Sequence, residues 1–282
     1  SSDLAQAAME CSTAAAPIAL CAAYVGGCAV AALLEPRRRQ NALVLFYHPI
    51  SQPARACWSL QLAAGIAPAD VELRRVALES GEHKSAEFLA VNPTGSVPAL
   101  VEDGLCIGES HTIMRYMCET VPRVADHWYP RDPRRRARVD DYLDWHQTHT
   151  RKGVPFFFHK YMASRFGMDP SDTRRAEGKA HYESAMRHVD AHALAEHAFL
   201  AGPEVSIADL ACYSELGPLQ WDDELGPVMA RLPNLRRWAA AMRAHRWADE
   251  VNSEVRGVIV KYQVAASRAA REGSEAARAR PT

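Results

Sequence analysis

The chain has 282 residues, enough for two domains of ordinary size or one large domain. Apolar residues make up 48% and charged residues 24%, the balance of a soluble globular protein, and a net charge of −1 gives no reason to expect nucleic acid as the main partner. The seven cysteines form no CxxC pair and no zinc-type spacing, and no nucleotide-binding glycine motif occurs. We therefore expect free thiols in a reducing compartment and no metal site.

The N-terminal segment, residues 1–42, is treated as an extension. No residue between Cys11 and Leu34 is charged, and the basic run EPRRRQ follows immediately. Residues 11–34 are long enough to span a bilayer, but they are dominated by Ala and Gly and contain Pro17. A targeting presequence, a weak membrane anchor and a helix packed on the body all remain open. The expected location is cytoplasmic, or organellar or membrane-associated through this extension.

A small α/β domain is predicted over residues 43–120. ALVLFYH (42–48) has the β-branched and aromatic character of a buried strand. A helix should follow from Ser51 to about residue 64, with Pro53 in its first turn and Gly65 after its end.

The second half of this domain should complete the order βαβαββα. VELRRVAL (71–78) predicts a strand, and HKSAEFLAV (83–91) predicts a short helix. VPALVED and LCIG predict two strands joined by a turn at Asp103–Gly104. Apolar residues at helical spacing then predict a helix over 109–119.

The rest of the chain is expected to be helical. Residues 121–132 form a Pro-containing linker, 133–265 a helical substrate-binding domain, and 266–282 a flexible tail. Ser206 to Asp209 resembles a capping box, with Asp in place of the usual Glu. Helical periodicity covers five segments: 133–165, 171–199, 206–221, 234–246 and 248–271.

Ser51 lies where a strand ends and a helix begins. The free N–H groups and positive dipole end of a helix N-terminus attract anions. The alternative interpretation is an ordinary N-cap that contributes about 1 kcal/mol to stability. This segment alone leaves both open.

Two further segments of the same domain have comparable features. In NPTGSVPAL (92–100), Pro98 at a strand start is compatible with an edge strand or a cis bond, either of which would leave the backbone of Val97 free to pair with a peptide-like ligand. In GESH (108–111), Ser110 begins an anion-receptive helix and Glu109 offers a carboxylate to an ammonium group. A turn proline and a simple helix cap are the alternatives, but together the three segments suit a zwitterionic peptide.

Residues 43–120 resemble the thioredoxin-like domain of glutathione transferases, through SQPARA, GEHKSAEFLAVNPTGSVPAL and DGLCIGESHTI. WYPRDPRRRARVDDYLDWHQTHTR (128–151) is similar to the start of the helical domain in the theta class. The resemblance covers about residues 43–262. It implies a thioredoxin-like domain followed by an all-helical domain, glutathione as co-substrate, and a homodimer.

The resemblance also implies roles for residues around the predicted helix start. Ser51 matches the serine that donates a hydrogen bond to the glutathione sulfur, with Gln52 as a supporting contact. Val97, before a cis Pro98, matches the residue that pairs through its backbone with the cysteinyl unit. Arg151 matches a basic residue near the serine that helps hold thiolate or substrate charge.

The remaining matched residues concern the two ends of glutathione. Glu109 and Ser110 match the pair that holds the γ-glutamyl amine and carboxylate. His83 matches a histidine near the glycyl carboxylate, and Lys84 is a second cation there. Ser96 stands where the family often has Lys, a departure that puts the strength of glycyl-carboxylate binding in question.

The function implied is a glutathione transferase that activates the thiol through Ser51 for attack on halides, epoxides or peroxides. Ser51 itself has no partnered base that would make it a nucleophile. A non-catalytic binding or assembly module on the same fold is the alternative. The apolar substrate site is expected to draw on some of five aromatic residues of the helical domain: Trp145, His149, Phe156, Phe157 and Phe158.

Overall fold

The computed structural model describes residues 42–278 of the chain. The apolar segment 11–34 and residues 279–282 of the predicted tail lie outside the described residues. Within the described part, no helix is both long enough and apolar enough to cross a bilayer.

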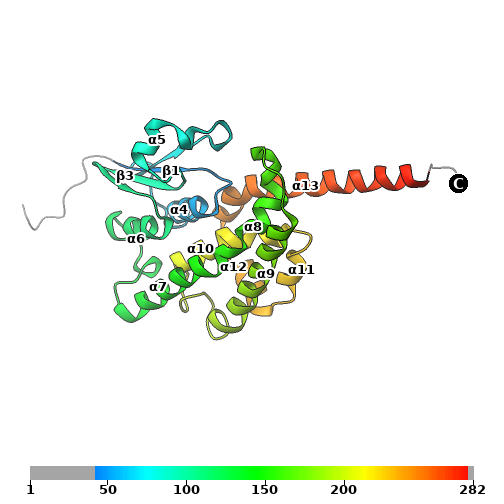
Figure 1. Ribbon diagram of the computed structural model, residues 1–282. Helices are drawn as coiled ribbons and strands as arrows, with labels where there is room; N and C mark the ends of the chain where they lie inside the picture. The colour runs from blue at the N-terminus through cyan, green and yellow to red at the C-terminus, as the bar shows by residue number, and fades with distance from the viewer. Residues whose placement is uncertain (1–41, 279–282) are drawn as a thin grey trace, which may run out of the picture. The chain divides into compact units, whose positions relative to one another are not determined.

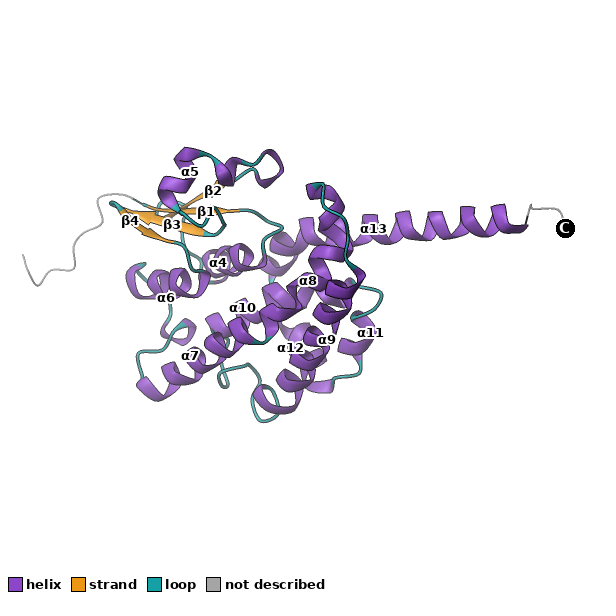
Figure 2. Cartoon of the chain, in the orientation of Figure 1, coloured by secondary structure: helices purple, strands orange, loops and turns teal. Residues whose placement is uncertain are grey.

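A four-stranded mixed sheet forms the first layer, in the order β2-β1-β3-β4 (Figure 2). Strand β1 (Leu43–Tyr47) pairs parallel with β2 (Val71–Arg75) and antiparallel with β3 (Ala99–Glu102). Strand β4 (Leu105–Ile107) pairs antiparallel with β3. The connecting turn has positive φ at both Asp103 (44°) and Gly104 (88°), as the short Asp-Gly hairpin predicted.

Helices cover both faces of this sheet. α4 (Gln52–Ala63) and α6 (Ser110–Thr120) lie on one face, and α5 (Ala86–Val91) lies on the other (Figure 1). Leu45 packs toward α4 and α6, whereas Phe88 of α5 packs against a smaller apolar cluster. The order βαβαββα and the thioredoxin-like fold class are confirmed.

The remainder is helical and is organised around a buried helix. All ten residues of α10 are buried, and α10 packs against both α4 and α7. The predicted capping box is present, because Asp209 accepts the backbone N–H of Ser206 at 2.9 Å. The helices are α7 (Pro133–Thr148), α8 (Val154–Phe157), α9 (Asp172–His188), α10 (Ile207–Leu216), α11 (Gly226–Ala230), α12 (Pro233–Arg243) and α13 (Arg246–Arg278).

The prediction of one long helix over residues 133–165 is wrong. Helix α7 ends at Thr148, and the chain turns through a 3₁₀ segment, Thr150–Gly153, before α8. Pro155 explains the break, since its ring would clash with the carbonyl of the residue four positions earlier in a continuous helix. The break places Arg151 on a short turn.

Other helix bounds also differ from the predicted ones. The helix predicted over 171–199 ends at His188 and passes into a single wider turn, Val189–Ala193. Helix α11 was not predicted, and α13 continues to Arg278, beyond the expected end at residue 271.

Candidate functional site

Ser51 is the residue before the first turn of α4, and its hydroxyl does not cap that helix. Its backbone carbonyl accepts the first helical hydrogen bond, from Arg55 N–H at 2.9 Å. The hydroxyl instead donates to the carbonyl oxygen of Val97 at 3.2 Å. The interpretation of Ser51 as a side-chain N-cap is therefore wrong, and the hydroxyl faces the Val97–Pro98 segment.

The loop that carries Ser51 is held by two buried side chains that no local pattern had marked. His48 Nδ1 accepts the N–H of Ile50 at 3.1 Å, and burial together with the nearby Arg75 guanidinium lowers the pKa of this histidine. Arg55, only 1% exposed, donates to the carbonyls of Pro49 (2.9 Å) and Ile50 (3.0 Å). The loop entering Ser51 is thus fixed from both sides.

The Val97–Pro98 peptide bond is cis. The loop before it is organised by Asn92, which is buried and donates to the carbonyl of Ser96 at 2.7 Å. Ser96 itself is exposed, and its hydroxyl lies 2.6 Å from that of Thr94. Ser51, Val97 and Pro98, predicted from two separate segments, therefore lie together.

His83 and Lys84 lie on a 3₁₀ turn against the same loop. Lys84 Nζ donates to the carbonyl of Gly95 at 3.0 Å. Gly95 has φ of 59°, and a Cβ there would lie 2.9 Å from the backbone carbonyl oxygen of His83, so this close approach requires glycine. His83 Nδ1 is buried without a hydrogen-bond partner among the described residues, and burial followed by the Lys84 charge lowers the pKa of this histidine.

Glu109 and Ser110 stand at the start of α6. Glu109 is the extended residue before the helix and is exposed, and Ser110 is its first residue and is 5% exposed. The Ser110 carbonyl accepts from the thiol of Cys57, which is buried, at 3.5 Å. The free N–H groups of α6 and the Glu109 carboxylate are thus presented next to each other.

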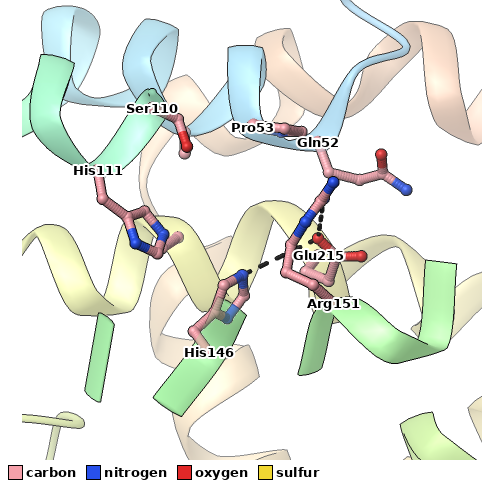
Figure 3. A pocket seen from close by; sticks show the side chains of 9 residues that line it. Gln52, Pro53, Ser110, His111, His146, Arg151 and Glu215 are labelled. Atoms are coloured by element: carbon pink, nitrogen blue, oxygen red, sulfur yellow. Dashed lines mark hydrogen bonds and ion pairs between the residues drawn. The ribbon is translucent and has the colours of Figure 1, made fainter. Parts of the chain in front are cut away.

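A small cavity of about 10 Å³, room for about one water molecule, lies between the starts of α4 and α6 and the helical domain (Figure 3). It brings together three predicted residues, Gln52, Ser110 and Arg151, and Ser51 adjoins it through Gln52. The other lining residues were not predicted: Pro53, Ala56, His111, His146, Ala211 and Glu215.

Arg151 reaches this cavity from the helical domain and is paired there. Its Nη1 donates to Glu215 Oε2 at 2.9 Å, and Tyr182 Oη donates to Glu215 Oε1 at 2.6 Å. Burial opposes the charge of Arg151, but the Glu215 carboxylate outweighs it, and the pKa of Arg151 is raised. The Glu109 carboxylate also raises the pKa of Arg151, so the start of α6 is close enough to interact electrostatically with this guanidinium.

His111 and His146 are two buried imidazoles in the cavity wall. Their ring centroids are 5.5 Å apart, and His146 Nε2 lies 4.0 Å from Glu215 Oε2, beyond hydrogen-bond distance (Figure 3). Burial lowers the pKa of each imidazole to about 3. The neighbouring His146 further lowers the pKa of His111, and the Arg151 charge further lowers the pKa of His146. Both are therefore neutral near pH 7.

The aromatic residues expected at the substrate site lie in other surroundings. Phe156 and Phe157 belong to the buried core. Trp145 is stacked between His149 at 4.9 Å and His188 at 4.5 Å. None of the five candidates lines the cavity beside Gln52 and Arg151. No group of three or more potential metal ligands occurs among residues 42–278.

Comparisons with known proteins agree with the fold. Residues 44–119 match the family described as "Glutathione S-transferase, N-terminal domain". Human glutathione S-transferase theta-2B is 33% identical over 211 residues, which cover 73% of this chain and 83% of that protein.

Two solved structures of human theta-class enzymes share the fold. Glutathione transferase theta-2, in complex with glutathione and an unknown ligand, has a TM-score of 0.69 at 29% identity, covering 79% of this chain and 90% of that one. A theta-class enzyme in complex with the glutathione conjugate of 1-menaphthyl sulfate has a TM-score of 0.68 at 30% identity, covering 81% and 91%. This chain therefore belongs to the glutathione S-transferase family of enzymes and is theta-like within it.

Proposed function

We propose that this chain conjugates glutathione to small hydrophobic electrophiles and that Ser51 stabilises the glutathione thiolate. The observation that carries the proposal is the direction of the Ser51 hydroxyl, which is not used to cap α4 and faces the Val97 carbonyl. A free thiol has a pKa of about 8.5, so only a few per cent is nucleophilic at neutral pH. A hydroxyl donor at a helix N-terminus lowers that pKa by stabilising the anion.

The tripeptide would lie across the turns described above. The backbone of Val97 pairs with the cysteinyl unit and brings the sulfur near the Ser51 hydroxyl. A serine hydroxyl has one hydrogen to donate, so on binding it would turn from the Val97 carbonyl to the sulfur. Glu109 binds the γ-glutamyl ammonium, and Ser110 with the free N–H groups of α6 binds its carboxylate. Gln52, which lines the adjoining cavity, is a supporting contact.

The glycyl carboxylate would be held by His83 and Lys84. The ammonium of Lys84 has three N–H donors, of which Gly95 O takes one, so two are left for a ligand. Because the pKa of His83 is lowered, this histidine contributes a neutral hydrogen bond rather than a charge near pH 7. Ser96 supplies a hydroxyl where the family often has a cation, so we expect weaker binding at this end.

Arg151 would favour negative charge at the sulfur or on the substrate. One of its five N–H donors is bound to Glu215, and others remain for the cavity side. Together with the buried Arg55, it gives the region two guanidinium groups against the single buried carboxylate of Glu215. The local charge balance therefore favours an anion.

The chemistry proposed is nucleophilic attack by the glutathione sulfur. With an alkyl or aryl halide, a carbon–sulfur bond forms as the carbon–halogen bond breaks and halide leaves with the electron pair. With an epoxide, the ring carbon–oxygen bond breaks and the alkoxide takes a proton from water. With a hydroperoxide, the sulfur takes the terminal oxygen as the oxygen–oxygen bond breaks, and the alkoxide leaves and takes a proton from water. A second glutathione then attacks the resulting sulfenic acid and gives the disulfide and water. The proposal includes a homodimer, which light scattering would test.

The test compares two serines at helix starts. Ser171 caps α9 through its side chain, whereas Ser51 does not cap α4. Ser51→Ala should lower turnover with halides or epoxides by about tenfold to a hundredfold, since a hydrogen bond to a charged group contributes about 1.5–3 kcal/mol. Ser171→Ala should leave turnover unchanged and lower stability by about 0.5–2 kcal/mol.

Two results would contradict the proposal. If calorimetry with millimolar glutathione detects no binding, the transferase and peroxidase activities are both excluded. If Ser51→Ala turns over at the parent rate, glutathione conjugation can stand but the role of Ser51 does not.

A further inference from the structure

Glu215 is a carboxylate enclosed by three structural elements at the edge of the site cavity. Its side chain is 1% exposed, and each oxygen accepts one hydrogen bond, from Arg151 in the 3₁₀ turn and from Tyr182 on α9. A buried charge without such partners would be strongly destabilising. The carboxylate is therefore held in one position.

The position of Arg151 is consequently fixed by contacts outside the glutathione-binding turns. Gly153, two residues after Arg151, packs so closely on Tyr182 that a Cβ would lie 2.1 Å from the Tyr182 ring. Tyr182 is fully buried and donates to Glu215 at 2.6 Å. The turn, α9 and α10 thus form one rigid support that directs the guanidinium into the cavity.

The charges around Glu215 are few and can be named from each element packed against it. Arg55 comes from α4 and Arg151 from the 3₁₀ turn, and both are attracted by the Glu215 carboxylate. His111 of α6 and His146 of α7 are neutral near pH 7. Burial and the Glu215 charge keep the Tyr182 phenol protonated by raising its pKa.

The remaining carboxylates near the cluster are on other elements. The Glu109 carboxylate, before α6, attracts the charge of Arg151, and the Glu254 carboxylate of α13 attracts the charge of Arg55. Both are exposed, so their charges are screened by water. Glu215 is therefore the main counter-charge to Arg151.

We propose that Glu215 is a positioning residue that fixes Arg151 at the glutathione site and limits how strongly this cation favours the thiolate. The inference depends on the proposed function, because it concerns the same bound thiol. It assigns a role to a residue that does not touch glutathione. Removing the negative charge while keeping the hydrogen bonds should strengthen the field of Arg151 at the sulfur.

Glu215→Gln tests this directly. The amide oxygen can still accept from Arg151, and the amide N–H can donate to the Tyr182 hydroxyl, so the geometry is kept. The midpoint of the pH profile of kcat/KM should move to lower pH by about one unit, the order of effect expected when one charge near the site is removed at an effective dielectric constant of about 20. When the ultraviolet absorbance of the bound thiolate is titrated, its pH midpoint should move by the same amount.

Tyr182→Phe is the matched variant. It keeps the charge of Glu215 and removes only the neutral donor that orients it, so the midpoint should stay and kcat should fall severalfold at unchanged KM for glutathione. If Glu215→Gln does not fold, this variant decides, and an unchanged kcat would overturn the positioning role.

The outcomes separate the two proposals. If the parent chain binds no glutathione, the proposed function fails. If the parent conjugates glutathione and Glu215→Gln titrates at the parent midpoint in both assays, only the role of Glu215 is refuted. An alkaline shift in Glu215→Gln would also refute it, since the sign would be wrong.

Discussion

Lowering the pH from about 7 to about 5 should destabilise the folded chain through the buried histidines His111 and His146. Both rings are buried in the cavity wall, at 7% and 2% exposure, and burial lowers the pKa of each to about 3. Their neutral forms are therefore retained in the folded state at pH values where an unfolded histidine is charged.

The sign follows from the proton balance. An unfolded histidine titrates near pH 6.5, so between about pH 6.5 and about pH 3 the unfolded chain binds more protons than the folded chain. Stability should be flat above this window and fall as the pH decreases through it. At about pH 5 each histidine should cost about 1.36 × 1.5, or about 2 kcal/mol, and the pair about 4 kcal/mol. His48, His83 and His188, whose pKa values are also lowered, act in the same direction.

The assay is urea unfolding at the two pH values, with the parent chain and two variants. His146→Gln removes one buried titrating group and should reduce the loss between the two pH values by about 2 kcal/mol. His181→Gln changes an exposed residue of α9 and should leave that loss unchanged. An acid loss of equal size in the parent and in His146→Gln would refute the assignment of a neutral, buried imidazole.

Three other substitutions have defined outcomes. Lys160→Met should lower stability by about 3–5 kcal/mol, since it removes the ammonium 2.7 Å from the fully buried Asp222 carboxylate. Gly153→Ala should lower both the melting temperature and kcat, because its Cβ would lie 2.1 Å from the Tyr182 ring. Ser96→Lys should lower the KM for glutathione severalfold by restoring the cation often found in the family.

Each of these has a control in the same chain. Lys261→Met, on an exposed face of α13, should change the melting temperature little. Gly257→Ala should be neutral or stabilising, because nothing lies within 4 Å of its added Cβ. Thr94→Lys, a cation two residues from Ser96, should not lower KM. If a variant and its control change the measured quantity by the same amount, the explanation given for that variant is refuted.

The first domain could be predicted from the sequence because its signals are local. The strand pattern of ALVLFYH, Pro53 at a helix start and Asp103–Gly104 at a hairpin each act over a few residues. Ser51 and Val97 were found in the same way, at ends of predicted strands and helices. The direction of the Ser51 hydroxyl could not be predicted, because its hydrogen-bond partner, the Val97 carbonyl, lies on a separate turn.

The helical half of the cavity could not be predicted, because its contacts join distant positions. Glu215 lies within an apolar helix and is 64 residues from Arg151. His146 lies on α7, and nothing near it in the sequence marks a site. His111 directly follows the predicted Ser110 on α6, but no pattern marks its imidazole. Pro155 is a local signal of the break after α7, but the helical periodicity continues through it over residues 133–165.

The thiol pKa of glutathione in the bound state tests the central claim most directly. It is measured by titrating the ultraviolet absorbance of the thiolate in the complex, for the parent chain and for Ser51→Ala. We expect the parent to lower the pKa by about two units, equivalent to about 2.7 kcal/mol, and Ser51→Ala to lose most of that shift. Equal thiol pKa values in the two complexes, at saturating glutathione, would contradict the assignment of Ser51 as the group that stabilises the thiolate.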